Sequence, residues 1–498
     1  MCARSTATQD DRGSLLEDLK CLTKGGVDEF ELQELRRTHL PIPEHRHVLD
    51  RETLLILGGR GTGKTRLFNV LRKLDNPTEL LTPPARTAGA EQREQYTAGF
   101  GGPGRVFPPK AVLTSLVSAG QLSDPERFWA GMLAGVLLQH DLTRSAVSPV
   151  LGPSLQRALG QDLSTPNRWL AAIEQPEEYG ALYNALDQAD KAIEDQKSTL
   201  FVTYDDLDRL VSEMSSAYPL VKGLLAFWLD SVRRWSAIRC KIFLRTDIFA
   251  AEEIAFTDSS KLRPLSVTLR WNPANLYRLV LKRLLNGSLR RPWLQFIGRR
   301  IPKHRLSEVD PWGLVPSTGE DDHRVFMERL VGQYMGSDKR RGDTYQWFLN
   351  HLQDSLGDIA PRSFLKLFEI AAGRQLDAGL PESAKLLAPE QVNEALKEVS
   401  KDRIEELKEE YKWIEAFGAN LAGKLVPMER AEFSRTCLRD IEWNKFPEYV
   451  HDRKDRLIDY LISLGILRET SDKRVHVPDI YLFGFGLKRK GGIRRPRA

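Results

Sequence analysis

Eight consecutive residues near the start of the chain have the composition of a phosphate-binding loop. Residues 58–65 read Gly-Gly-Arg-Gly-Thr-Gly-Lys-Thr, which fits the pattern G-x-x-x-x-G-K-[ST]. The glycines permit backbone conformations that point amide N–H groups inward at phosphate oxygens. The lysine reaches the β- and γ-phosphates, and the final hydroxyl is a hard oxygen ligand for Mg²⁺. The loop therefore predicts a site for a nucleoside triphosphate and Mg²⁺. Its expected binding residues are Gly58, Gly59, Arg60, Gly61, Thr62, Gly63, Lys64, Thr65 and Arg66.

A second motif places acidic residues at the end of an apolar run. Residues 200–204 are mostly apolar and lead into Asp205-Asp206-Leu207-Asp208-Arg209. Such a run is typical of a buried parallel strand whose carboxyl end reaches a ligand site. We expect Asp205 to hold Mg²⁺ together with Thr65, and Asp206 to orient the water that attacks the γ-phosphate. Because aspartate is one methylene shorter than glutamate, a nucleotide-binding scaffold that does not hydrolyse stays an alternative.

These two motifs need a sheet to bring them together. An apolar run at 53–57 precedes the glycines, and helical spacing of apolar residues follows them to position 74. Further apolar runs alternate with helical segments, which predicts an α/β fold with a parallel sheet covered on both faces. Residues 75–110 are rich in glycine and proline and are expected to form a long loop. The expected strands are 53–57, 111–117, 200–205, 240–245 and 265–269.

The same patterns divide the chain into four parts. A helical N-terminal segment is followed by a P-loop core that contains a helical insertion at 75–198. A helical lid comes next, and the last part is a charge-rich helical linker with a winged helix and a basic tail. The expected bounds are 1–50, 51–285, 286–385 and 386–498.

The end of the chain has the outline of a winged helix. Residues 456–464 have helical spacing, and Gly465 is placed to cap the helix at its carboxyl end. Two short runs at 466–468 and 474–477 flank a turn, which predicts a β-hairpin after the helix.

Two cationic segments indicate a nucleic-acid partner. Residues 487–497 contain six Lys or Arg and no acid. Residues 282–305 contain eight Lys or Arg and no acid, interleaved with Trp293 and Phe296. Such segments favour salt-dependent contact with a phosphate backbone. A solubilising tail and a surface that docks an acidic protein are the alternatives.

The phosphate loop and the acidic motif resemble those of P-loop ATPases of the AAA+, STAND and KAP group. The string at 205–209 is especially similar to the KAP pattern. A winged helix after such a module resembles origin-recognition-type ATPases and some bacterial conflict and phage-defence ATPases. The resemblance implies a P-loop NTPase parallel sheet with a helical lid, in which the two motif strands have another strand between or beside them. The chain departs from the group at Asp206, where AAA+ enzymes carry glutamate, and in lacking the membrane insertion found in many KAP proteins.

The resemblance also implies residues that respond to the γ-phosphate. The strand at 242–247 is similar to the one that carries a polar sensor, so Arg245 or Thr246 is expected in that role. Arg362, which follows Pro361 at the start of an apolar helix, looks like the second sensor arginine of AAA+ proteins. Arg278 and Arg283 are candidates for a finger acting on a neighbouring subunit, with a solvated helix face as the alternative.

Composition describes an ordinary globular protein. The 498 residues are 41% hydrophobic and 28% charged, with a net charge of +5. The four cysteines lie far apart without metal-ligand spacing. The N-terminus lacks the apolar core of a signal peptide, and no run approaches the ~18 apolar residues that span a bilayer. A reduced, cytoplasmic setting without membrane contact is expected.

Together these features predict an ATP-binding and hydrolysing switch whose nucleotide state controls assembly or the engagement of a partner or nucleic acid. ATP is the expected nucleotide, because no Asn-Lys-x-Asp guanine signature is evident. The expected protein partners are further copies of the chain or a co-encoded effector, and the resemblance extends the role to bacterial anti-phage defence. An ATP-dependent DNA loader for replication or transposition stays an alternative, as does the scaffold without turnover.

Overall fold

The chain folds into two compact units. The computed structural model describes residues 9–23, 32–73, 93–102, 104–212, 214–251, 254–298, 306–309, 312–411, 413–439, 441–446 and 450–490. One unit, here called the sheet unit, comprises Val27–Leu32 and Pro41–Arg270. The other, here called the helical unit, comprises Met1–Gly26, Gln33–Leu40 and Trp271–Ala498.

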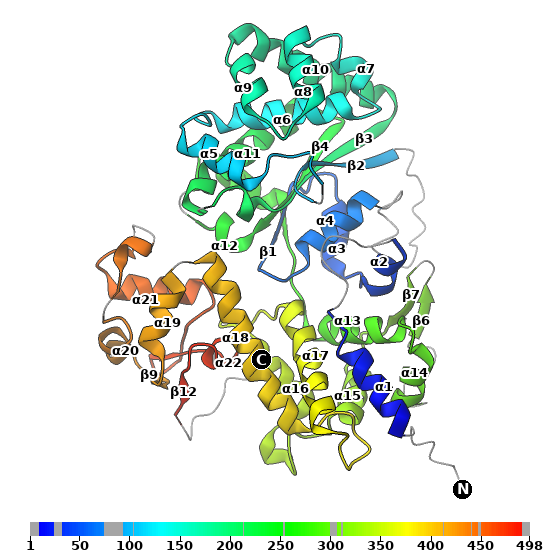
Figure 1. Cartoon of the computed structure of the whole chain (residues 1–498), viewed down its shortest axis with the longest axis vertical. Coiled ribbons are helices and arrows are strands. Elements are labelled where there is room, and N and C mark those ends of the chain that lie inside the picture. The colour runs from blue at the N-terminus through cyan, green and yellow to red at the C-terminus, as the bar shows by residue number, and fades with distance from the viewer. Residues whose placement is uncertain are drawn as a thin grey trace. The chain divides into compact units, whose positions relative to one another are not determined.

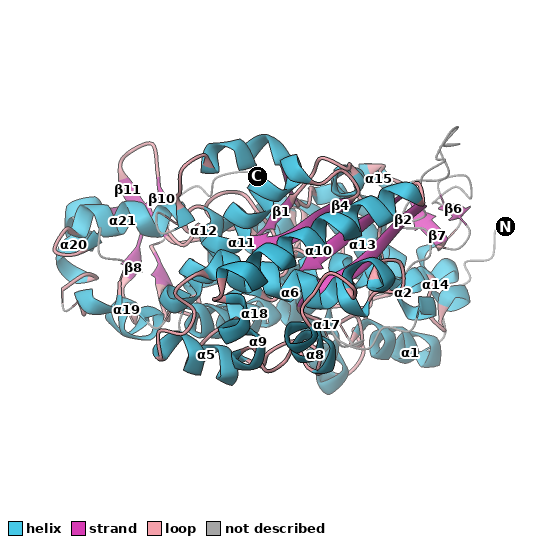
Figure 2. Cartoon of the chain, turned by 90° about the horizontal axis from the view of Figure 1, so that it is seen from above, coloured by secondary structure: helices cyan, strands magenta, loops and turns pink. Residues whose placement is uncertain are grey.

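A five-stranded parallel sheet forms the centre of the sheet unit, in the order β2-β3-β4-β1-β5. All residues of β1 and β3 are buried, as expected for inner strands of a sheet covered on both faces. Because β4 lies between β1 and β3, one strand separates the two motif strands, which confirms the arrangement expected from the resemblance. Figure 2 shows β1, β4 and β2 of this sheet as magenta arrows. The strands are β1 (Leu55–Gly58), β2 (Arg93–Phe100), β3 (Ser198–Tyr204), β4 (Ile238–Arg245) and β5 (Ser266–Thr268).

Helices cover this sheet on both faces. Helix α4 contacts β1, β2 and β4, and Figure 1 shows α6, α10 and α11 on the opposite side. Trp129 of α6 packs edge-on against Tyr204 of β3, with the ring centroids 5.7 Å apart. Tyr204 also contacts Trp228 of α11, with a centroid distance of 6.1 Å. These aromatic contacts fix the helices to the strand that carries the acidic motif. The helices of this unit are α3 (Pro43–Leu49), α4 (Lys64–Lys73), α5 (Lys110–Ser118), α6 (Pro125–Gln139), α7 (Arg144–Val147), α8 (Pro153–Gln161), α9 (Asn167–Ile173), α10 (Pro176–Asp195), α11 (Met214–Arg234) and α12 (Thr246–Phe249).

One predicted strand is wrong. Residues 111–117 belong to helix α5, in which Leu113 and Leu116 are the buried residues. Apolar residues at 112, 113, 116 and 117 have helical spacing, which the β-branched residues in this segment obscured. The second strand is instead β2, inside the segment expected to be a loop. Strand β2 is an edge strand that is buried only at its carboxyl end, so it lacks the apolar run of an inner strand.

The helical unit combines helices with short strand pairs. Helices α17 and α18 pack against each other, and α1 packs against α17. Helix α21 covers the predicted range 456–464 to within two residues. Its elements include α1 (Gln9–Leu19), α2 (Leu32–Thr38), α13 (Pro273–Leu285), α14 (Arg290–Ile297), β6 (Leu306–Val309), β7 (Gly313–Pro316), α15 (Glu320–Leu330), α16 (Thr344–Leu352), α17 (Pro361–Ala378), α18 (Pro389–Glu410), α19 (Trp413–Leu421), β8 (Leu425–Val426), β9 (Met428–Glu429), α20 (Arg430–Thr436), α21 (Lys454–Ser463), β10 (Arg468–Glu469), β11 (Arg474–His476), α22 (Asp479–Leu482) and β12 (Lys488–Arg489).

The carboxyl-terminal part of the helical unit is a winged helix. Helices α19, α20 and α21 accompany a three-stranded sheet in the order β10-β11-β9. Strands β10 and β11 form the predicted antiparallel hairpin. Gly465 follows α21 with φ +78°, a left-handed conformation that ends a helix at low cost for glycine. The expected winged helix is therefore confirmed, while tail residues 491–497 lie outside the described residues.

Within the described parts of the chain, no helix combines the length and the apolar character needed to cross a membrane.

A buried carboxylate fixes the start of β4. Asp190 of α10 accepts backbone N–H groups from Ser236 at 2.9 Å and from Ala237 and Ile238 at 2.7 Å each. The side chain is only 8% exposed, so these amides satisfy a carboxylate that water cannot reach freely. Asp190 thereby sets the register at which β4 enters the sheet.

We expect Asp190→Ala to lower the free energy of unfolding of the sheet unit by about 2–4 kcal/mol, because it leaves buried amides without an acceptor. Urea denaturation followed by circular dichroism measures the change. Asp195→Ala, at an exposed position of the same helix, is the matched control and should change it by less than about 0.5 kcal/mol. Equal effects of both substitutions would contradict the anchoring role.

Candidate functional site

The phosphate loop connects β1 to α4 as the sequence predicts. Gly58 ends β1, the next residues form the loop, and Lys64 begins α4. Gly61 and Gly63 have φ values of +77° and +98°, which side chains other than glycine rarely adopt. A Cβ atom on Gly58 would lie 2.5 Å from the hydroxyl oxygen of Thr62, so this position also excludes a side chain. The loop therefore turns its backbone toward the start of a helix, where an anion is favoured.

Lys64 lies over this loop. Its Nζ donates to the carbonyl oxygens of Gly58 at 2.8 Å and Gly59 at 2.9 Å, while the Thr62 hydroxyl donates to Gly59 at 2.8 Å. Burial lowers the pKa of Lys64 to about 8, and the negative charge of Asp205 opposes that shift. The cation is thus held inside the loop beside a carboxylate.

Asp205 follows the end of β3 and is only 4% exposed. Its backbone N–H donates to the Phe100 carbonyl of β2 at 3.1 Å, and its carboxylate accepts a hydrogen bond from Thr65. The remaining oxygen Oδ2 is buried without a hydrogen-bond partner in the structure. Burial, followed by the neighbouring charge of Asp206, raises the pKa of Asp205 to about 7.

The donor set fits Mg²⁺. The Thr65 hydroxyl lies next to the Asp205 carboxylate, and the Oδ2 oxygen of Asp205 is buried without a hydrogen-bond donor. Mg²⁺ prefers such hard ligands and usually takes only one or two protein groups. The structure thus brings together Lys64, Thr65 and Asp205, as the sequence predicts.

The strand order places the glycine-rich loop after β1 on one side of β4 and the carboxylate at the end of β3 on the other. This arrangement identifies the fold. This is the α/β fold of the P-loop NTPases. Helix α4 begins inside the loop, and the site lies at the carboxyl ends of the parallel strands, where α/β sheets bind their ligands.

Asp206 has an unusual backbone conformation. Its φ and ψ values of 57° and 24° lie in the left-handed region, which aspartate and asparagine adopt more readily than other residues with a Cβ atom. Its carbonyl accepts the Arg209 N–H at 2.9 Å in the short helix Leu207–Arg209. The turn changes the chain direction directly after Asp205, and the Asp206 side chain is partly exposed beside it.

Arg245 at the end of β4 lies in the same site. It pairs in register with Gly58 of β1, and its charge contributes to lowering the pKa of Lys64. Its side chain is 6% exposed and binds Asp247 through two contacts, of 3.0 and 2.6 Å. Asp208 lies 3.6 Å from the same guanidinium. Arg245 is therefore held in place by two carboxylates.

Asp208 and Asp247 are site residues that the sequence did not single out. Each belongs to a motif that was recognised, Asp208 to the acidic string and Asp247 to the strand-end Arg-Thr-Asp. The signal was the alternation of acids and arginines in both strings. Asp247 lies two residues from Arg245 in the chain, whereas Asp208 reaches Arg245 because β3 and β4 are adjacent in the sheet.

Arg362 belongs to the helical unit. It is at the start of α17, is 42% exposed and lies 3.7 Å from Glu406 of α18. Its role as a sensor of nucleotide stays a prediction.

The cations of α13 serve structural purposes. Arg278 donates to the carbonyl of Pro316 at 2.9 Å and to Asn275 at 2.7 Å, and Arg283 donates to the carbonyl of Leu22. Lys282 is fully buried and donates to the carbonyl of Trp312. These contacts to protein groups support neither an arginine finger in Arg278 or Arg283 nor the alternative of a solvated helix face.

The structure also changes the interpretation of the basic segment at 282–305. Trp293 is fully buried, with its indole N–H donating to Asp18 at 2.7 Å, and Phe296 is 7% exposed. The interpretation of these aromatics and of Lys282 as a nucleic-acid surface is wrong, because packing removes them from solvent. Residues 299–305 lie outside the described residues.

No protein-family model matches the chain, and a search of curated proteins finds no relative. Solved structures do match it. They include the ORC1 protein of Aeropyrum pernix in complex with DNA, at 14% identity and a TM-score of 0.32, covering 92% of this chain and 93% of that chain. The Cdc6p of Pyrobaculum aerophilum matches at 12% identity and a TM-score of 0.27, covering 96% and 92%. The ORC2 protein of Aeropyrum pernix, with ADPNP and ADP, matches at 11% and 0.31, covering 92% and 93%.

The burial of Asp205 leads to a test of stability against pH. Its folded pKa of about 7 exceeds the ordinary value of 3.8, so ionising it opposes folding, and the cost grows as pH rises from about 4 to 7. We expect Asp205→Asn to raise the free energy of unfolding of the ligand-free protein at pH 8 by on the order of 2–4 kcal/mol. The gain should shrink as pH falls from 7 to 4.

Thermal unfolding across this pH range measures the gain. Asp208→Asn is the matched control and should not stabilise the protein, because its carboxylate faces the Arg245 guanidinium. A stability gain for Asp205→Asn that is the same at every pH would contradict the assigned ionisation.

Proposed function

We propose that the protein binds ATP with Mg²⁺ and hydrolyses it, and that its nucleotide state controls assembly or the engagement of nucleic acid. The observation that carries the proposal is the meeting of Lys64, Thr65 and Asp205 in one site at the ends of β1 and β3. Loop amides and a cation on one side, and a buried carboxylate on the other, are what a metal-bound triphosphate requires.

The residues divide the work of phosphoryl transfer. The amides of the loop bind the β- and γ-phosphates. Lys64 leaves the two loop carbonyls that it contacts in the structure and neutralises the phosphate charge instead. Thr65 and Asp205 would hold Mg²⁺, which supplies further neutralisation of the phosphate oxygens when bound. Protein-held charges of this kind supply most of the catalysis in this reaction, since positioning matters more than covalent chemistry.

Asp206 is the proposed water-orienting residue. It directly follows the metal-binding carboxylate, and the left-handed turn sets its side chain apart from that of Asp205. Arg245 is the proposed γ-phosphate sensor, positioned by Asp208 and Asp247. A γ-phosphate that binds the Arg245 guanidinium would compete with Asp208 and Asp247 for it. The ion pairs would then weaken, and the turn after β3 and helix α12, which carry these two acids, could move. Arg362 is proposed to pass nucleotide state to the helical unit.

The winged helix supports nucleic acid as the controlled partner, since it is a fold used to bind duplexes. Further copies of the chain are the proposed assembly partners, and Arg362 and the winged helix are the parts through which the nucleotide would act. A co-encoded effector and a role in anti-phage defence remain proposals that rest on the family resemblance alone.

We expect Lys64→Ala to weaken Mg²⁺-ATP binding by at least about 100-fold, because it removes the charge that faces the β- and γ-phosphates. Isothermal titration calorimetry with a non-hydrolysable ATP analogue measures the affinity. Lys110→Ala, an exposed lysine at the start of α5 in the same unit, is the control and should bind like the unaltered protein. Unchanged binding by Lys64→Ala would overturn the site assignment.

Turnover tests the role of Asp206. We expect Asp206→Asn to keep nucleotide affinity within about threefold while lowering kcat by about 10- to 100-fold, because the amide cannot accept the proton of the water. Asp206→Glu restores the length found in AAA+ enzymes and should equal or exceed the unaltered protein. Phosphate release under saturating ATP measures kcat. Equal turnover in all three proteins would leave the non-hydrolysing scaffold as the better account.

A further inference from the structure

The exposed face of α21 is acidic, although α21 is the helix that precedes the hairpin of the winged helix. Its side chains Asp455 and Asp459 are 81% and 66% exposed. Arg430 of α20 contacts Asp455 at 3.2 Å, Asp459 at 2.7 Å and Glu469 of β10 at 3.0 Å. Three carboxylates against Arg430 and the exposed Arg456 of the same helix leave this face a net charge of −1. Placing it in the groove of a nucleic acid would set carboxylates against phosphates.

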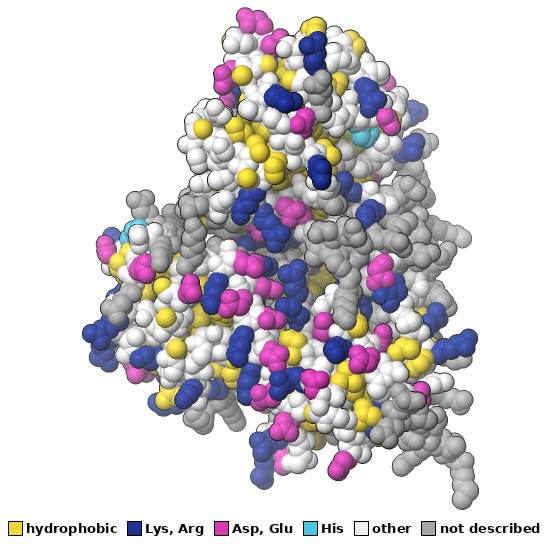
Figure 3. Space-filling model, in the orientation of Figure 1, with side chains coloured by type: hydrophobic (Ala, Val, Ile, Leu, Met, Phe, Trp, Pro, Cys, Tyr) yellow, Lys and Arg dark blue, Asp and Glu magenta, His cyan; other side chains and the backbone are white. Residues whose placement is uncertain are grey.

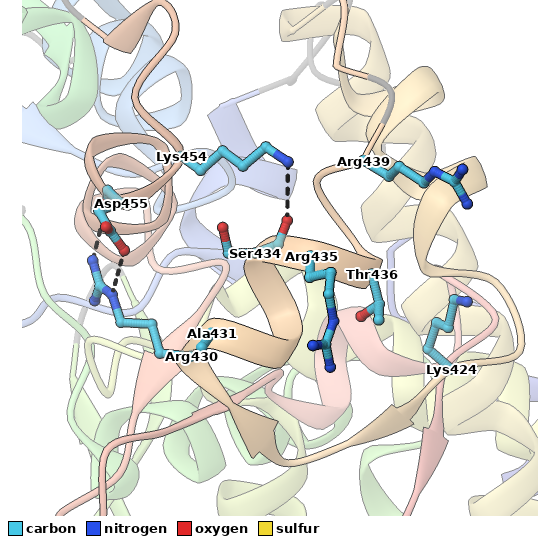
Figure 4. A pocket seen from close by; sticks show the side chains of 9 residues that line it. All are labelled: Lys424, Arg430, Ala431, Ser434, Arg435, Thr436, Arg439, Lys454 and Asp455. Atoms are coloured by element: carbon cyan, nitrogen blue, oxygen red, sulfur yellow. Dashed lines mark hydrogen bonds and ion pairs between the residues drawn. The ribbon is translucent and has the colours of Figure 1, made fainter.

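Cationic side chains gather beside this face instead. A hollow of about 970 Å³ in the winged helix is lined by five Lys or Arg and by a single acid, Asp455. That acid is paired with Arg430, which leaves four cations around the hollow. Figure 4 shows them entering from separate segments, and Figure 3 shows Lys and Arg side chains at the surface where α20 lies. They are Lys424 before β8, Arg435 of α20, Arg439 after α20 and Lys454 at the start of α21.

These four cations have no carboxylate partner among the described residues. Lys454 donates to the Ser434 carbonyl at 3.3 Å. Elsewhere in the helical unit, cations between helices are paired, as in Lys366 with Asp402 at 2.8 Å. A cluster of like charges repels itself, so the hollow favours an anionic ligand that the chain does not provide.

The lining distinguishes among anions. Among the described residues that line it there is no aromatic side chain, so these residues offer no platform for stacking the bases of a single strand. Ala431 is the one apolar residue of this described lining, whereas small-molecule sites are lined mainly by hydrophobic and aromatic side chains. What remains is a row of charges with the Thr436 and Ser434 side chains between them, which suits phosphates of a duplex backbone.

We propose that this hollow binds the phosphate backbone of a double-stranded nucleic acid, and that the carboxylates on the exposed face of α21 keep this helix from base contact. Binding is then salt-dependent and nearly independent of sequence. The inference names the contact surface within the proposed function and rests on its nucleic-acid part.

The test is the double substitution Arg435→Gln with Arg439→Gln, at two exposed positions. Fluorescence anisotropy of a labelled DNA duplex of mixed sequence measures affinity between about 50 and 200 mM salt. We expect affinity at low salt to fall on the order of 10- to 100-fold, and the slope of log affinity against log salt to decrease by about 2. Lys339→Gln with Arg340→Gln removes the same charge from exposed positions outside the hollow and should change the slope by less than about 0.5.

Several outcomes would overturn the proposal. The first is an unchanged slope for the double variant, and the second is an equal loss in the control pair, which would show a diffuse charge effect. Competition by polyglutamate as strong as that by unlabelled duplex would assign the hollow to acidic proteins, and tripolyphosphate binding without duplex binding would assign it to small anions. A preference of more than about 1,000-fold for one duplex sequence would contradict the role given to α21.

The variants also separate this inference from the ATPase proposal. Arg435→Gln with Arg439→Gln should bind the ATP analogue normally, because both residues belong to the helical unit and the nucleotide site to the sheet unit. If nucleotide binding fails in the unaltered protein while duplex binding responds as expected, the ATPase proposal falls and the hollow stands. If nucleotide binds and duplex does not, the reverse holds.

Discussion

The burial of two opposite charges, Lys64 and Asp205, is the constraint on which the site depends. Neither charge would be stable alone in a place where burial lowers the pKa of one and raises that of the other. Their mutual attraction, the loop carbonyls and the Thr65 hydroxyl offset part of that cost. The remaining cost is a reason for the site to favour a charged ligand, since a triphosphate and a divalent cation would satisfy both groups more fully.

The sheet order makes this juxtaposition possible. With β4 between β1 and β3, the phosphate loop and the Asp205 carboxylate lie on either side of one strand end. The residue at that end is Arg245, so the middle strand brings a third charge into the site. Asp190 fixes where β4 begins, at the opposite end of the strand from Arg245. The Asp190 carboxylate, which lies outside the site, thus helps to fix the position of Arg245 within it.

The helical unit uses its cations in two different ways. Lys282 and Arg283 are packed against carbonyl oxygens, where they satisfy buried backbone groups and are not available to a partner. Around the winged-helix hollow, the side chains of Lys424, Arg435 and Arg439 have no such partner among the described residues, and Lys454 has only the Ser434 carbonyl. Both groups consist of Lys and Arg, so the sequence alone does not distinguish them. Their surroundings in the structure separate a structural cation from one that is available to a ligand.

The sequence by itself determined the phosphate loop, the acidic strand end and the winged helix, because each is local. Glycine conformations, a run of buried residues and a capped helix before a hairpin are written in neighbouring positions. It missed β2, whose few apolar residues reflect an edge position that only pairing with β3 creates. It also missed Asp208 as a partner of Arg245, and the burial of Lys282 and Trp293. Those features were decided by the tertiary structure, since ion pairing and burial depend on which distant segments lie side by side, and periodicity along one segment carries no record of its neighbours.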